Sequence, residues 1–154
     1  MPNWCENRVS IYGDKKTVKS FIKEAIKDEK FQFKNLIPMP EDLRDTTSGF
    51  MGKGTPEQEE LEERQTKNLR KYGYKDWYDW SNDVWGTKWD VDVEVDYVGD
   101  DCIQMHFDTA LGPPVGVYNY ISKAYPDLTV SWFFDEPGCE VAGYLNNEIL
   151  KYEV

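Results

Sequence analysis

The chain has 154 residues, of which 40% are apolar and 15% aromatic, and its formal net charge at pH 7 is −11. This length and composition fit one packed domain over residues 1–154, and they exclude the disordered class of chains, which is poor in aromatic side chains. The negative charge disfavours direct binding of nucleic acid and of an anionic membrane surface, because both need clustered Lys and Arg.

No stretch of the sequence approaches the roughly 20 apolar residues of a membrane-spanning helix. The first residues, MPNWCENRV, lack the basic segment and the apolar run of a signal peptide. We therefore expect a cytoplasmic protein. Its three cysteines, Cys5, Cys102 and Cys139, form no CxxC pair, so we expect reduced thiols.

The amino-terminal part of the chain predicts a strand, a helix and a second strand. Apolar and polar residues alternate over residues 7–12, as in a half-buried strand. Asp14 is a favourable N-cap for a helix over residues 15–27, where apolar side chains recur at three- and four-residue spacing. Residues 31–36 predict a short strand, which two prolines then terminate.

A helical insertion is predicted over about residues 41–88. Its first part, residues 41–54, contains three glycines and predicts a loop. Thr55 as N-cap and Gly73 as terminator bracket a long, highly charged helix. A second helix is expected over about residues 75–84, and its apolar stripe contains two tryptophans.

The remaining sequence predicts two strands, a helix and a final hairpin. The strands cover residues 89–97 and 101–108, the helix covers residues 113–124, and the hairpin joins residues 128–135 to 139–146. Without the insertion, two sets of strands each surround one helix. This order is typical of an α+β, ferredoxin-like fold, in which an antiparallel sheet has helices packed on one face.

Three parts of the chain carry a family resemblance that spans nearly its whole length. They are residues 1–7 (MPNWCEN), residues 77–80 and 85–90 (WYDW and WGTKWD), and residues 107–110 (FDTA) with Pro113 and Pro114. Together they resemble the Api92-like (YubB-like) proteins of phages, prophages and plasmids. The resemblance implies a ferredoxin-like domain from a mobile element in a bacterial host. The family has no settled activity, and the term ferredoxin-like describes topology and does not imply an iron–sulfur cluster.

The first candidate site is acidic. Four carboxylates alternate with valines; they belong to Asp90, Asp92, Glu94 and Asp96, and Asp101 follows in the next turn. Side chains two apart on a strand share a face and lie about 6.6–7 Å apart. Such a ladder could imitate nucleic-acid phosphates and occupy a basic surface. The alternatives are an ordinary solvated sheet face and a Ca²⁺ or Mg²⁺ site, although one straight strand supplies no converging ligands.

The second candidate site is aromatic. Trp77, Trp80, Trp85 and Trp89 lie within thirteen consecutive residues. Their rings could form the wall of a ligand pocket, or they could simply pack the core. The first reading of the whole sequence is therefore a non-enzymatic acidic module, without cofactor or metal, that binds a host or phage protein with a basic surface. The alternative is a small-ligand binding or hydrolytic protein with a tryptophan-walled pocket.

A third candidate pairs Cys5 with the single histidine, His106. A cysteine nucleophile needs a base within hydrogen-bond reach, and the same side chains could hold a transition metal. Both ideas require the first strand to lie beside the strand that contains His106, which is possible because the first strand of a ferredoxin-like sheet is central. Self-association through a sheet edge is a further possibility, and the sequence leaves the oligomeric state open.

Overall fold

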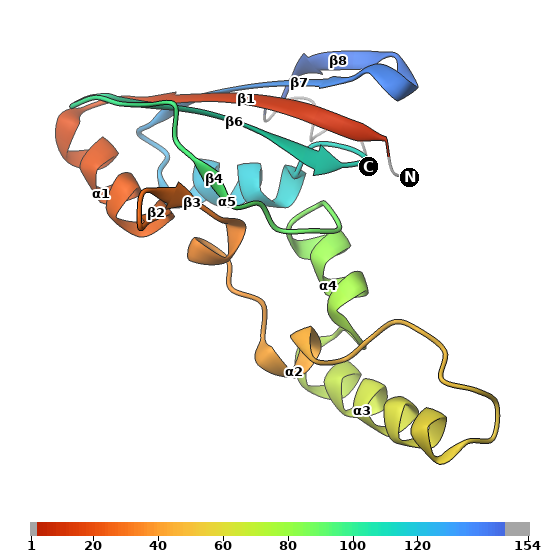
Figure 1. Cartoon of the computed structure of the whole chain (residues 1–154). Helices are drawn as coiled ribbons and strands as arrows, with labels where there is room; N and C mark the ends of the chain where they lie inside the picture. Colours follow the sequence, from red (N-terminus) through yellow and green to blue (C-terminus); the bar gives the residue numbers. More distant parts are fainter. Residues whose placement is uncertain (1–2, 147–154) are drawn as a thin grey trace.

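The structure, a computed structural model, describes residues 3–146. Its largest layer is an antiparallel sheet with the strand order β5-β6-β1-β7-β8 (Figure 1). The strands are β1 (Trp4–Tyr12), β5 (Tyr97–Val98), β6 (Cys102–Ala110), β7 (Thr129–Glu136) and β8 (Val141–Tyr144). The predicted α+β class and antiparallel sheet are thus confirmed.

Helices α1 (Lys15–Ala25) and α5 (Val115–Ala124) lie on the same face of this sheet (Figure 1). Alternate residues of β1 are buried, and two of them, Val9 and Ile11, join the apolar stripes of both helices in one core. Trp132 of β7 is completely buried there and packs edge-on against Phe107 and Tyr118. The predicted N-cap is also confirmed, because the Asp14 carboxylate accepts hydrogen bonds from the first amides of α1.

A buried asparagine joins the three central strands. The Asn7 side-chain amide donates to the Phe107 carbonyl at 3.3 Å and to Thr109 Oγ1 at 3.0 Å, while Asn7 Oδ1 accepts the indole N–H of Trp132 at 2.9 Å. Because Asn7 is 1% exposed, these groups have no access to water and depend on one another.

A second, smaller sheet contains β2 (Ile26–Lys27), β3 (Lys30–Phe31) and β4 (Val93–Glu94) in that order. Helix α1 ends before residue 27 because its last predicted residues enter β2. The predicted strand over residues 31–36 is wrong beyond Phe31, since the chain turns there into the short helix η1 (Phe33–Asn35).

The predicted strand over residues 89–97 is largely wrong. Only β4 and the start of β5 are strands, and they belong to different sheets. The alternation in burial nevertheless persists: Val91 is buried and Val93 half-buried, whereas Asp92 and Glu94 are exposed. The valines therefore face inward as predicted, but the chain crosses from one sheet to the other and does not form a continuous ladder.

Between η1 and β4 the chain forms α2 (Glu41–Arg44), α3 (Pro56–Tyr72) and α4 (Trp77–Val84), which extend away from the main sheet (Figure 1). The predicted caps of α3 are confirmed, since Thr55 accepts the Gln58 amide and Gly73 adopts a left-handed conformation. The predicted loop over residues 41–54 begins with the single turn of α2. In the part of the chain that the structure describes, no helix combines the length and apolarity needed to cross a bilayer.

Candidate functional site

The structure separates the carboxylates of the acidic candidate site. Asp90 Oδ1 accepts the Phe33 amide at 2.5 Å, and Asp90 Oδ2 accepts the Lys34 amide at 3.2 Å, so this side chain fastens η1 to the neighbouring segment. Burial raises the pKa of Asp90 above its ordinary value, against the opposing effect of these amides. The prediction that Asp90 belongs to an exposed ladder is therefore wrong.

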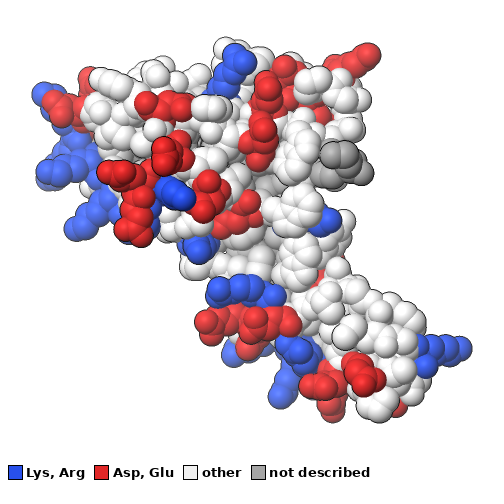
Figure 2. Space-filling view, in the orientation of Figure 1, with Lys and Arg blue, Asp and Glu red and all other residues white. Residues whose placement is uncertain are grey.

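The other carboxylates of this candidate site are exposed, and two have a local partner. Asp92 lies 3.7 Å from the Lys30 ammonium group, and Asp96 Oδ2 is hydrogen-bonded to His106 Nδ1 at 2.7 Å. Glu94 is opposite Lys30 in the small sheet, and Asp101 is exposed just before β6. Figure 2 shows acidic side chains gathered over the region of β4 and β6, and basic ones over α1. Among residues 3–146, no group of three His, Cys, Asp or Glu is placed to hold a metal ion.

Cys5 and His106 lie on adjacent strands but on opposite faces of the sheet. Cys5 is opposite Thr109 and is buried, whereas His106 is opposite Arg8 and is exposed. Burial raises the pKa of the Cys5 thiol to about 11, which disfavours the nucleophilic thiolate. The hydrogen bond with Asp96 raises the pKa of His106. The two strands are thus adjacent, as both ideas require, but the side chains on opposite faces form neither a Cys–His dyad nor a shared metal site.

The four tryptophans of the aromatic candidate site divide into two pairs. Trp80 and Trp85 are 6% and 4% exposed and pack edge-on with ring centroids 5.0 Å apart. The indole N–H of Trp85 donates to the Ile37 carbonyl at 2.9 Å. Trp77 is half-buried, and Trp89 is 41% exposed. The first pair packs the core, while the second pair presents indole surface to solvent.

Trp89 lies in a short loop, residues 85–90, that is fastened at three points. The Trp85 carbonyl accepts the Gly116 amide at 3.0 Å, at the start of α5. Thr87 Oγ1 is buried and donates to the Ala110 carbonyl at 3.0 Å. At the far end, Asp90 binds the amides of η1. Between these anchors Lys88 is half-buried and Trp89 is exposed, and the anchors fix where the backbone places both side chains.

Two glycines allow the loop to approach α5. Gly86 has a φ of +88°, and a Cβ there would lie 2.8 Å from the Val115 amide nitrogen. A Cβ on Gly116 would lie 1.8 Å from the Val84 carbonyl oxygen. Backbone meets backbone at both positions, which explains glycine at each.

Trp77, Trp85 and Trp89 line an open groove with a volume of about 630 Å³. Pro38 and Met39 of the linker after η1 form part of the apolar lining, and the same groove is lined by three cations, Lys34, Arg44 and Lys88. The ammonium group of Lys88 lies 4.5 Å from the ring centroid of Trp89, within the range of a cation–π interaction. The one acidic lining residue, Asp90, already has amide partners. We refer to this feature as the tryptophan groove.

Trp89 also borders a smaller hollow of about 340 Å³, which shares Asp90 with the groove. Trp4, which is 46% exposed, lies there with its ring centroid 6.1 Å from that of Trp89. Asp92 and Asp108 contribute acidic side chains to this hollow. Trp89 therefore divides a groove with a cationic rim from a hollow with an acidic rim.

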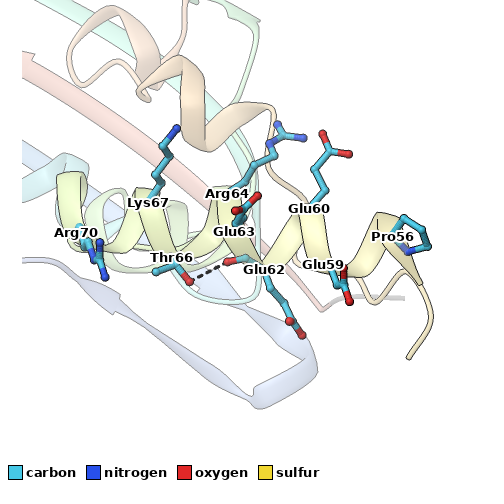
Figure 3. A pocket seen from close by; sticks show the side chains of 9 residues that line it. All are labelled: Pro56, Glu59, Glu60, Glu62, Glu63, Arg64, Thr66, Lys67 and Arg70. Carbon is cyan, nitrogen blue, oxygen red and sulfur yellow. Dashed lines mark hydrogen bonds between the residues drawn. The ribbon is translucent and has the colours of Figure 1, made fainter. Parts of the chain in front are cut away.

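The outer surface of α3 offers no comparable site. Figure 3 shows side chains from Pro56 to Arg70 that project from one helix in different directions. Thr66 Oγ1 donates back to the Glu62 carbonyl at 2.8 Å, and the Arg64 guanidinium group donates to the Asp45 carbonyl at 2.7 Å, so these side chains already have partners within the chain. The separation of acidic and basic residues along α3 is instead accounted for by the helix dipole.

Sequence reasoning missed Lys34, Arg44 and Met39 because they lie 33–55 residues from the tryptophans of the groove and carry no local motif. Lys88, between Thr87 and Trp89, was within reach, since a lysine beside an exposed indole can stack on it. Comparisons of this chain with protein-family models, with curated proteins and with solved structures found no match.

Proposed function

We propose that this protein binds a small planar ligand in the tryptophan groove. One observation carries the proposal: Trp89 remains 41% exposed although the loop that contains it is fastened by buried hydrogen bonds. Exposing a large indole is costly, and a fixed aromatic surface lowers the entropic cost of stacking a ligand on it. The groove volume lies within the roughly 300–1,000 Å³ that is usual for small-molecule sites.

A panel of neutral planar molecules (adenosine, thymidine, riboflavin and indole), followed by thermal shift and calorimetry, tests this proposal. We expect at least one of them to bind the wild type and to lose about tenfold or more in affinity in Trp89→Ala, because base–aromatic stacking contributes about 1–3 kcal/mol. Tyr144→Ala is the matched control, since Tyr144 is exposed at a strand outside the groove. Equal loss in both variants, or no binding by any of the four, would contradict the proposal.

We also propose that the chain is an Api92-like protein with a ferredoxin-like core and a helical insertion. The topology supports this proposal. Strands β1 and β5 run parallel with β6 between them, and β6 and β7 run parallel with β1 between them. The connection from β1 to β5 begins with α1, and the connection from β6 to β7 is α5. Both pairs therefore have the arrangement expected of a split β-α-β unit.

A second candidate function is binding of a basic protein through Asp92, Glu94, Asp96 and Asp101. It is favoured by their exposure, although Asp92 and Asp96 already have partners. The triple variant Asp92→Lys, Glu94→Lys, Asp96→Lys should then fail to retain a basic partner that the wild type retains from bacterial lysate. Unchanged retention by a variant with an unaltered circular dichroism spectrum would remove this candidate.

A further inference from the structure

The lining of the tryptophan groove carries an uneven distribution of charge. The molecule as a whole has a net charge of −11, yet Lys34, Arg44 and Lys88 gather at this groove from three separate segments. The only acidic lining residue, Asp90, is engaged by the Phe33 and Lys34 amides. A ligand in the groove therefore meets three cations and one carboxylate, whose two oxygens already accept hydrogen bonds from backbone amides.

The cations lie beside the stacking surface. The Lys88 ammonium group lies above the Trp89 ring, and a lysine stem is flexible enough to turn toward an anion while a planar ring takes its place. Arg44 is exposed, and its guanidinium group lies 3.8 Å from the exposed carboxylate of Glu41. A guanidinium group in this setting can hold a phosphate by two parallel hydrogen bonds.

We propose that the ligand of the tryptophan groove is a free mononucleotide, with its base stacked on the exposed indoles and its phosphate held by Arg44, Lys34 and Lys88. This inference rests on the function proposed above and names the chemical class of the ligand. A free nucleotide is favoured over a nucleic-acid strand by the acidic rim beyond Trp89. A longer strand that crossed Trp89 would place further phosphates against Asp92 and Asp108, where they are repelled.

Calorimetric titration of the full chain with AMP, adenosine, inorganic phosphate and pentaadenylate tests the inference. We expect AMP to bind about tenfold or more tightly than adenosine, as charge-assisted contacts to the phosphate imply, and phosphate alone to bind more weakly than AMP. Arg44→Ala and Lys34→Ala should each weaken AMP binding and leave adenosine binding unchanged. Lys123→Ala, an exposed lysine on α5 outside the groove lining, should change neither.

Five results would overturn the inference, and they separate it from the proposed function. Equal affinities for AMP and adenosine, or AMP binding unaffected in Arg44→Ala, would leave a groove for planar molecules that does not select an anion. Tighter binding of pentaadenylate than of AMP would replace the free nucleotide by a strand. Failure of AMP while a neutral planar molecule binds would overturn only the inference, whereas failure of every probe would overturn both.

Discussion

Gly116→Ala is expected to lower the free energy of unfolding by about 3 kcal/mol or more, a large part of the 5–15 kcal/mol that stabilises a typical domain. The added Cβ would lie 1.8 Å from the Val84 carbonyl oxygen and 3.0 Å from the Trp85 carbonyl carbon. Both obstacles are backbone atoms, so α4 and α5 must separate. In a helix without such a clash, alanine is more stable than glycine by about 1 kcal/mol. Helix propensity alone therefore predicts that Gly116→Ala stabilises the protein, whereas the clash predicts a loss of stability.

Urea unfolding followed by tryptophan fluorescence measures this effect. Gly112→Ala is the matched control, because a Cβ there meets no atom within 4 Å, and its effect should stay within about 0.5 kcal/mol. Separation of α4 from α5 also breaks the Gly116 hydrogen bond to Trp85, so surviving folded Gly116→Ala protein should bind planar ligands less well. Similar stability of the two variants would show that the close approach of the helices is wrong.

Asn7→Leu is expected to cost about 3 kcal/mol of stability, although leucine has a similar volume and is more apolar. The substitution leaves the buried Trp132 indole N–H without its acceptor and removes the donor to Thr109 Oγ1. Each buried polar group that loses its partner costs about 1–3 kcal/mol. The same urea experiment applies to this variant.

The control for Asn7→Leu is Gln104→Leu, which alters an exposed amide on the solvent face of β6. We expect a change of no more than about 0.5 kcal/mol there. If Asn7→Leu were as stable as the wild type, the network that joins the three central strands would contribute nothing. The core would then be held by apolar packing alone.

Local signals in the sequence predicted the parts of the fold that depend on nearby residues. Asp14, Thr55 and Gly73 act where they were expected because a cap needs only the next few amides or carbonyls. The α+β class followed from the order of strand and helix periods. The alternation of valines near residue 93 correctly predicted which side chains face inward.

The same alternation wrongly predicted a continuous strand with a ladder of carboxylates, because strand pairing depends on hydrogen-bond partners that are distant in the sequence. Asp90 leaves the strand pattern to bind the amides of Phe33 and Lys34, more than fifty residues away. The tryptophan groove was beyond prediction for the same reason. The tryptophans were recognised as the candidate wall of a pocket. Lys34 and Arg44 come from two other segments, which only the tertiary fold brings to the same groove as the tryptophans.

The binding of a planar ligand in the tryptophan groove is tested most directly by an NMR titration with adenosine, followed through the indole N–H resonances of the six tryptophans. Saturable shifts of the Trp89 and Trp77 resonances are predicted, with the Trp132 resonance unmoved, because its indole is completely buried and bonded to Asn7. If adenosine leaves the Trp89 and Trp77 resonances unchanged, thymidine, riboflavin and indole are titrated in turn. Unchanged Trp89 and Trp77 resonances with all four molecules, or equal shifts of all six resonances, would contradict the proposed function.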